Sequence, residues 1–202
     1  MTALLLTVLL YQPLAPINPI EQDTLPAWAL HFEAGMVGPN GVVTTGPEVS
    51  AMLEMLVVHP FMVRGTADAR YGQVTSGLFP NGNLYTLSLG ADAIYYRGTN
   101  HLTGYFGVGA FYTVHSFDPF ERTADSLRAN EGWTAVDIQP KFGYRLILGL
   151  RFSRIYSMEI SVDDLHPDFK MTGTQGDGVE SRSYKTTRTG AFRLTFGYVV
   201  PL

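Results

Sequence analysis

The stretch Tyr85-Thr86-Leu87-Ser88-Leu89-Gly90-Ala91-Asp92-Ala93 places an apolar residue at every second position and a polar or small residue between. Successive side chains of a β-strand point to opposite faces, so this alternation indicates a strand with one apolar and one polar face. The pattern extends to both sides and predicts a strand over residues 83–97.

The same alternation recurs along the chain from Trp28 onward, broken by turn-forming residues. Each of these segments is long enough to cross a bilayer when tilted, which takes about 9–11 residues. The alternation therefore predicts eight strands, at residues 28–37, 49–58, 61–72, 83–97, 102–115, 132–146, 151–163 and 189–200.

The connections between these segments alternate in length. Short turns are expected at His59-Pro60, at residues 98–101 and near Gly149, and longer polar loops at 38–48, 73–82, 116–131 and 164–188. Short turns on one rim and long loops on the other are typical of outer-membrane barrels. The fold expected is all-β, an eight-stranded antiparallel up-and-down transmembrane β-barrel.

The polar face of most of these segments carries charges of both signs. In a closed barrel with its apolar face toward lipid, these charges would lie in the narrow interior and pair there. Leu87, Leu89, Phe192, Leu194 and Phe196 should then point outward. The expected interior charge network comprises Glu33, Glu54, Arg64, Asp68, Arg70, Asp92, Lys141, Arg145, Glu159 and Arg193.

The composition agrees with a membrane location. Of the 202 residues only 16% are charged, against about 25% in a typical soluble domain. The net charge of −4 offers no broad basic field, so a nucleic-acid partner is not expected. The chain has no cysteine, which excludes a disulfide scaffold and a thiolate site.

The first residues form a separate segment. The apolar run from Ala3 to Leu10 is too short for a transmembrane helix and resembles the core of a signal peptide, although no Lys or Arg precedes it. A short buried helix or strand is the alternative. We expect a signal peptide at 1–15, an unstructured proline-rich lead-in at 16–27, and the barrel at 28–202.

Residues 28–202 resemble the small eight-stranded outer-membrane barrels of the OmpA-like and OmpX-like group, in local phrases such as Tyr105-Phe106-Gly107-Val108-Gly109-Ala110 and at the end of the chain. In that group the barrel-assembly machinery reads the pattern polar-x-Gly-x-x-apolar-x-apolar. The resemblance places this assembly signal at Thr195, Gly197, Val200 and Leu202, where Leu202 departs from the usual Phe and Pro201 lies beside it. It implies a monomer in the bacterial outer membrane, with lipid, lipopolysaccharide and the assembly machinery as partners.

Some barrels of this size are enzymes that trim lipid A. Their deacylase branch carries a His-x-Ser-x-Asn phrase on a late strand, but the corresponding stretch here, residues 152–159, lacks both the His and the Asn. His115 and Ser116 are neighbours that point to opposite strand faces, so they are not expected to form a catalytic pair. We expect no catalytic residue and no cofactor.

Several other residues admit a functional interpretation beside a structural one. The segment from Asp163 to Asp168 could hold a divalent cation, but a solvated loop start is the simpler interpretation, and no metal is expected. Arg182, Lys185 and Arg188 could meet lipopolysaccharide phosphates or lie in a solvated loop. We expect an aromatic girdle from Tyr11, Trp28, Tyr95 and Tyr96, and Arg154 near the rim of short turns.

Three functions remain open at this point. The first is a non-enzymatic outer-membrane barrel with a structural, surface-interaction or narrow-pore role. The second is a lipid A-modifying enzyme of the acyl hydrolase type. The third is a soluble lipocalin-like barrel, which would need the apolar set inside and the charged set outside.

Overall fold

The computed structural model describes residues 25–38, 43–75, 81–99, 101–120, 133–164, 168–175, 178–185 and 191–202. Within these ranges the regular structure consists of β-strands. No helix among them is long and apolar enough to cross a membrane. The segments expected as signal peptide and as most of the lead-in lie outside the described residues.

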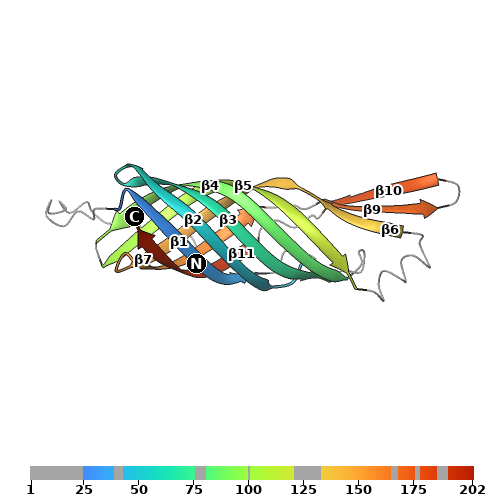
Figure 1. Ribbon diagram of the computed structural model, residues 1–202, viewed down its shortest axis with the longest axis horizontal. Coiled ribbons are helices and arrows are strands. Elements are labelled where there is room, and N and C mark those ends of the chain that lie inside the picture. The colour runs from blue at the N-terminus through green and yellow to red at the C-terminus, as the bar shows by residue number, and fades with distance from the viewer. Residues whose placement is uncertain are drawn as a thin grey trace, which may run out of the picture.

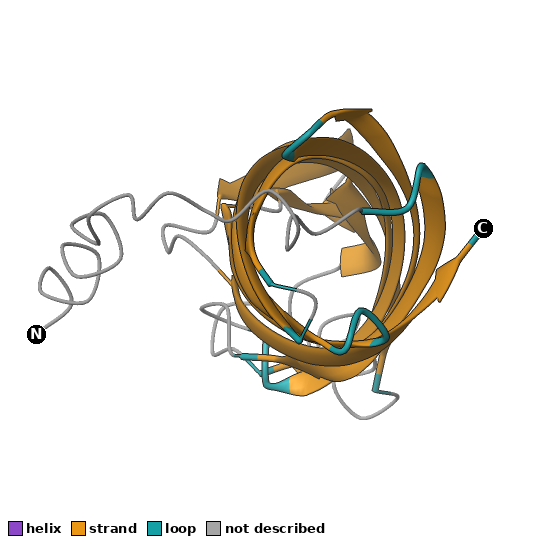
Figure 2. Cartoon of the chain, turned by 90° about the vertical axis from the view of Figure 1, so that its left-hand side faces the viewer, coloured by secondary structure: helices purple, strands orange, loops and turns teal. Residues whose placement is uncertain are grey.

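Eight of the strands close into one antiparallel barrel, in the spatial order β1-β11-β8-β7-β5-β4-β3-β2. Figure 2 looks along this barrel and shows the strands as a closed ring. The predicted fold is confirmed. The barrel strands are β1 (Trp28–Val37), β2 (Gly46–Val58), β3 (Phe61–Val74), β4 (Gly82–Gly98), β5 (Leu102–Pro119), β7 (Lys141–Phe152), β8 (Tyr156–Asp164) and β11 (Ala191–Pro201).

The first and last barrel strands meet at the end that holds the short turns. Ala29 on β1 pairs with Pro201 on β11, and the Leu202 N–H donates to the Trp28 carbonyl at 3.0 Å. The connections β2–β3, β4–β5 and β7–β8 lie at this same end (Figure 1). We call this end the turn side and the opposite end the loop side.

The strand expected over 132–146 is wrong, as is the turn near Gly149. The structure divides this region into β6 (Trp133–Gln139) and β7, with Pro140 between them. Proline has no N–H for a strand ladder, and the break at Pro140 separates two strands that pair with different neighbours. The short turn lies at residues 153–155, where Ser153 and Arg154 adopt positive φ values of 49° and 63°. Arg154 thus lies on the turn side, as expected.

The long connections contain regular structure that the sequence reading missed. β9 (Asp168–Gln175) and β10 (Gly178–Lys185) lie within the segment expected as a loop at 164–188. They join β6 in a three-stranded antiparallel sheet of order β10-β9-β6. Figure 1 shows this sheet beyond the loop side, with β9 and β10 running nearly along the long axis of the molecule.

The side chains alternate in burial along every barrel strand. Leu89 is 60% exposed, Phe142 72% and Phe196 58%, whereas the charged residues of the opposite face are buried. Leu87 and Phe192 also lie on the exposed outer face. A soluble barrel needs the reverse arrangement, so the lipocalin-like alternative is wrong. An apolar outer surface with the polar backbone paired inside the sheet suits a lipid bilayer.

Candidate functional site: the charged interior of the barrel

The structure brings most of the expected charge network into the barrel interior. Arg64, Arg145 and Arg193 are among its largest fully buried side chains. Glu33, Glu54, Asp68, Asp92 and Glu159 are also buried, while Arg70 and Lys141 lie half-buried nearer the loop side. Two connected groups of contacts result, one toward each end of the barrel.

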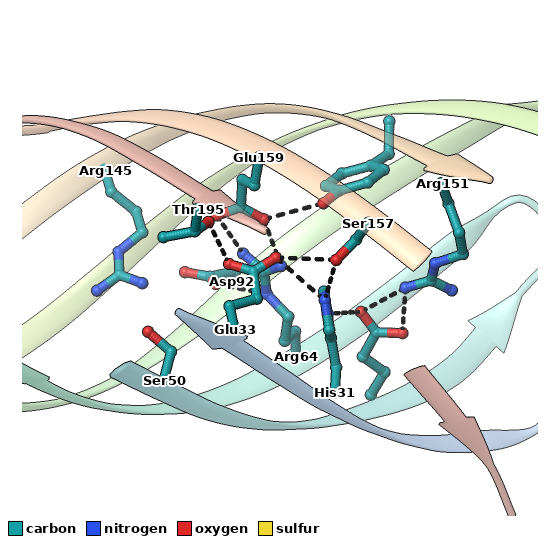
Figure 3. A network of polar contacts seen from close by, with 12 residues as sticks. His31, Glu33, Ser50, Arg64, Asp92, Arg145, Arg151, Ser157, Glu159 and Thr195 are labelled. Atoms are coloured by element: carbon teal, nitrogen blue, oxygen red, sulfur yellow. Dashed lines mark hydrogen bonds and ion pairs between the residues drawn. The ribbon is translucent and has the colours of Figure 1, made fainter. Parts of the chain in front are cut away.

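The turn-side network is centred on Arg64 of β3. Its Nε donates to Asp92 Oδ2 at 2.9 Å, and its two Nη atoms donate to the Glu159 carboxylate at 2.7 and 3.3 Å. These two hydrogen bonds to Glu159 form the bidentate arrangement in which arginine and carboxylate interact most strongly. Because Glu159 belongs to β8, this contact joins opposite walls of the barrel (Figure 3).

His31 of β1 is the centre of a second set of contacts in the turn-side network. Its Nε2 lies 2.6 Å from Ser157 Oγ and 3.0 Å from Glu33 Oε1, and its Nδ1 lies 3.2 Å from Glu54 Oε1. Thr195 donates its hydroxyl to Glu33 at 2.5 Å. Every one of these side chains is buried, and their contacts join β1 to β2, β8 and β11.

Arg151 of β7 completes the turn-side network. Its Nη2 donates to both Glu54 oxygens, at 2.9 and 2.7 Å, and to Tyr96 OH at 3.0 Å. The Arg151 guanidinium also lies over the Tyr96 ring, 5.0 Å from its centroid. Tyr96 is therefore part of the interior, and its expected place in an outer aromatic girdle is wrong.

The loop-side network links Arg70, Arg145 and Arg193 to Glu48, Asp68 and Asp163. Arg145 Nη2 donates to Asp68 Oδ2 at 2.6 Å, and Arg70 Nε lies 2.8 Å from Glu48 Oε2. Arg193 pairs with Glu48, and Arg70 pairs with Asp163. Three arginines thus meet three carboxylates, which leaves this network electrically balanced.

Apolar side chains fill the interior beside the turn-side network. Met62, Ile94, Tyr96, Tyr105 and Ile147 form a buried cluster, against which Leu25 and Leu56 pack. Gly149 makes room for this cluster, because a Cβ there would lie 2.1 Å from the Tyr105 ring. Tyr105 in turn donates its hydroxyl to Glu159 at 3.2 Å. The glycine that resembled a turn residue is instead a close-approach residue inside β7.

At the loop side of the described barrel lies a small cavity of about 60 Å³, lined in part by Arg70, Thr86 and His115. A cavity of this size with polar walls has room for a few water molecules.

Sequence reasoning missed several members of the two networks. Glu48 was placed in a loop, Arg151 at a strand start, and Asp163 in a possible metal cluster. His31 lies within the strand expected over 28–37 but was not part of the expected charge network. Strict alternation would have found all four, because each occupies an inward position once the strand ends are extended.

The other candidate residues do not form sites in the described part of the chain. No group of three or more His, Cys, Asp and Glu side chains is arranged there to hold a metal ion. His115 Nδ1 lies 3.0 Å from Thr86 Oγ1, while the neighbouring Ser116 is exposed on the outer face. Tyr11, Arg188 and residues 165–167 lie outside the described residues, as do the side chains of Arg182 and Lys185.

Searches with protein-family models and against curated proteins find no match to this chain. Solved structures do match it. The outer membrane protein OprG from Pseudomonas aeruginosa superposes with a TM-score of 0.65 at 16% identity, over 88% of this chain and 98% of that chain. The chain has the fold of the small outer-membrane β-barrels.

Two further structures share this outer-membrane fold. Neisserial surface protein A superposes with a TM-score of 0.52 at 13% identity, over 87% of this chain and 97% of that chain. A major outer membrane protein from Thermus thermophilus gives a TM-score of 0.51 at 17% identity, over 86% of this chain and 100% of that chain. Together with the apolar outer face, this fold indicates a protein of the bacterial outer membrane. The role of Thr195, Gly197, Val200 and Leu202 as an assembly signal stays a prediction.

Proposed function

We propose that this outer-membrane barrel is a non-enzymatic, non-conducting anchor that presents the β10-β9-β6 sheet at the cell surface for interaction. The observation that carries the proposal is the filled interior. Arg64, Asp92 and Glu159 are joined across the barrel by bonds of 2.7–3.3 Å and are almost fully buried. A solute crossing at this level would have to break these charge-assisted bonds.

The sheet beyond the loop side supports the surface role. Long loops of outer-membrane barrels face the outside. Here the described parts of the longest connections form β6, β9 and β10, which lie beyond the loop side of the barrel (Figure 1). Lipopolysaccharide phosphates remain a proposed partner of the basic positions Arg182, Lys185 and Arg188.

An acyl hydrolase is the second candidate, because one contact set favours it. The arrangement is that of a catalytic triad, with Ser157 in the place of the nucleophile, His31 in that of the base and Glu54 in that of the acid that orients the base. Ser157 Oγ lies 2.6 Å from His31 Nε2, and His31 Nδ1 lies 3.2 Å from Glu54. Ser157 is only 3% exposed, however, and even a Cβ at the neighbouring Gly197 would lie 2.5 Å from its Oγ. No acyl group fits beside this hydroxyl, so we assign the contacts to packing.

The proposed function is tested in cells that produce the full chain or a variant in which a short glycine linker replaces 168–185. Entry of a chromogenic β-lactam should stay at the level of cells without the protein in both cases, because the interior and not the sheet closes the barrel. Lipid A mass spectra should also be unchanged by the full chain and by Ser157→Ala. Raised entry with the full chain, or a lipid A species that disappears with Ser157→Ala, contradicts the proposal.

A further inference from the structure

β10 forms an edge of the three-stranded sheet. It pairs with β9 on one side, from Gly178 opposite Gln175 to Lys185 opposite Asp168. Among the strands that the structure describes, none pairs with its other side. A free edge offers a row of backbone N–H and C=O groups to a further strand.

The charges along β10 are self-complementary. Glu180 precedes Ser181 and Arg182 follows it, so the two charges lie at equal distances on either side of Ser181. The neighbouring sequence repeats the arrangement, with Asp177 four positions before Ser181 and Lys185 four positions after it. The acidic residues thus precede Ser181 in the sequence, and the basic residues follow it.

This pattern suits one pairing of two β10 strands. An antiparallel pair centred on Ser181 places position 180 of each strand opposite position 182 of the other, so acid meets base twice. A parallel pair in register places Glu180 opposite Glu180 and Arg182 opposite Arg182. Opposite charges stabilise such cross-strand pairs and like charges destabilise them, so the antiparallel arrangement is favoured.

The direction of β10 determines where the second copy lies. β10 runs nearly along the long axis of the molecule, beyond the loop side of the barrel (Figure 1). Antiparallel strands run in opposite directions, so two barrels paired through β10 point toward each other. Two barrels in the same membrane point the same way and cannot form this pair.

We infer that β10 binds the β10 strand of a second copy of this chain in a facing outer membrane, and so joins neighbouring cells. The inference rests on the proposed role of the sheet as a surface-interaction element and names its partner. Within its own membrane the barrel remains the monomer expected from the sequence.

The absence of cysteine from the chain permits a sharp test. In the inferred pair the two Ser181 residues are directly opposite, with Cα atoms about 4.5–5.5 Å apart, which a disulfide can span. The two Ser183 residues are offset by four positions and lie about 14 Å apart, which a disulfide cannot span. Ser181→Cys is therefore the probe, and Ser183→Cys on the same strand is its matched control.

Two strains that produce Ser181→Cys chains with tags of different size are mixed and treated with a mild oxidant. The inference expects a disulfide-linked species containing one chain from each strain, and none with Ser183→Cys. Equal crosslinking at both positions indicates random collision and overturns the inference. So does crosslinking only within a strain, or none at all.

Charge reversal gives a second, independent measurement. In the Ser181→Cys background, Glu180→Arg alone or Arg182→Glu alone should lower the yield of mixed dimers about tenfold, because two pairs change from attraction to repulsion. The double variant should restore the yield. Mixing one strain with Glu180→Arg and the other with Arg182→Glu should restore it too, and equal yields from all these combinations would overturn the pairing.

Failure of the inference is distinguishable from failure of the proposed function. All variants are first compared for outer-membrane level and for heat-modifiable migration, which reports a folded barrel. If they are folded and β-lactam entry stays at background, but no mixed dimer forms, the anchor proposal stands and the partner is another molecule. If entry rises, the anchor proposal itself fails.

Discussion

Gly197 of β11 lies directly opposite Ser157 of β8, and a Cβ at Gly197 would lie 2.5 Å from Ser157 Oγ. The same Cβ would lie 2.6 Å from Glu33 Cγ and 2.7 Å from His31 Nε2. The absence of a side chain at 197 therefore makes room for the buried cluster that joins β1 to β8.

Gly197→Ala should destabilise the barrel by about 1–3 kcal/mol, because overpacking forces neighbouring side chains or backbone to shift. The measurement is urea unfolding in lipid vesicles. Gly65→Ala is the matched control, since a Cβ at Gly65 meets no atom within 4 Å. Equal stability of the two variants would show that position 197 is not tightly packed.

Arg64→Met should lower the free energy of unfolding by about 3–5 kcal/mol, because it leaves Asp92 and Glu159 buried without their cation. Adding Asp92→Asn and Glu159→Gln to this variant should recover much of the loss, since the stranded charges are then gone. Arg97→Met, at an exposed position of β4, serves as the control and should change stability by less than about 0.5 kcal/mol. A loss below about 1 kcal/mol for Arg64→Met would contradict the buried network.

Gly149 and Ser153 distinguish the observed turn from the one expected from the sequence. Gly149→Ala should destabilise by about 1–3 kcal/mol, because its Cβ meets the Tyr105 ring. Ser153→Gly should be neutral or stabilising by up to about 1 kcal/mol, since glycine adopts positive φ without the strain of an L side chain. The opposite ranking in the same unfolding assay would place the turn at Gly149 after all.

Leu89→Arg tests the outer face. Leu89 is 60% exposed within the apolar surface, and an arginine facing lipid near the bilayer midplane costs about 2–4 kcal/mol. Ser88→Ala, at the adjacent inward position, keeps the outer surface unchanged and controls for the site. If Leu89→Arg is as stable as the parent in vesicles, this face of β4 does not meet lipid.

The alternation of apolar residues such as Leu87 with polar residues such as Asp92 is enough to predict the barrel and the inward face of each strand, because a strand has only two faces. Strand ends are less certain. Glu48 lies where a strand continues into what looks like a polar loop, and composition alone does not separate an inward acid there from a solvated one. Asp163 ends the expected strand over 151–163, where its inward position follows from alternation with Glu159 but its partners do not.

The errors at Gly149 and at 132–146 have a common origin. Glycine and proline commonly indicate turns between strands. Here, however, Gly149 lies inside β7, because a side chain at this position would clash with the ring of Tyr105, which is 44 positions away in sequence and adjacent in space. Pro140 separates β6 from β7, and β6 is recognisable only through its pairing with β9. Such long-range contacts cannot be obtained from one strand's pattern.

Conductance of the purified protein in planar lipid bilayers tests the central claim most directly, because the proposed function requires that the paired arginines and carboxylates leave no continuous water path through the barrel. We predict baseline current over a wide range of applied voltage, with a general porin inserted afterwards to show that the same bilayer reports open channels. A large, steady current step at each insertion of this protein would contradict the account.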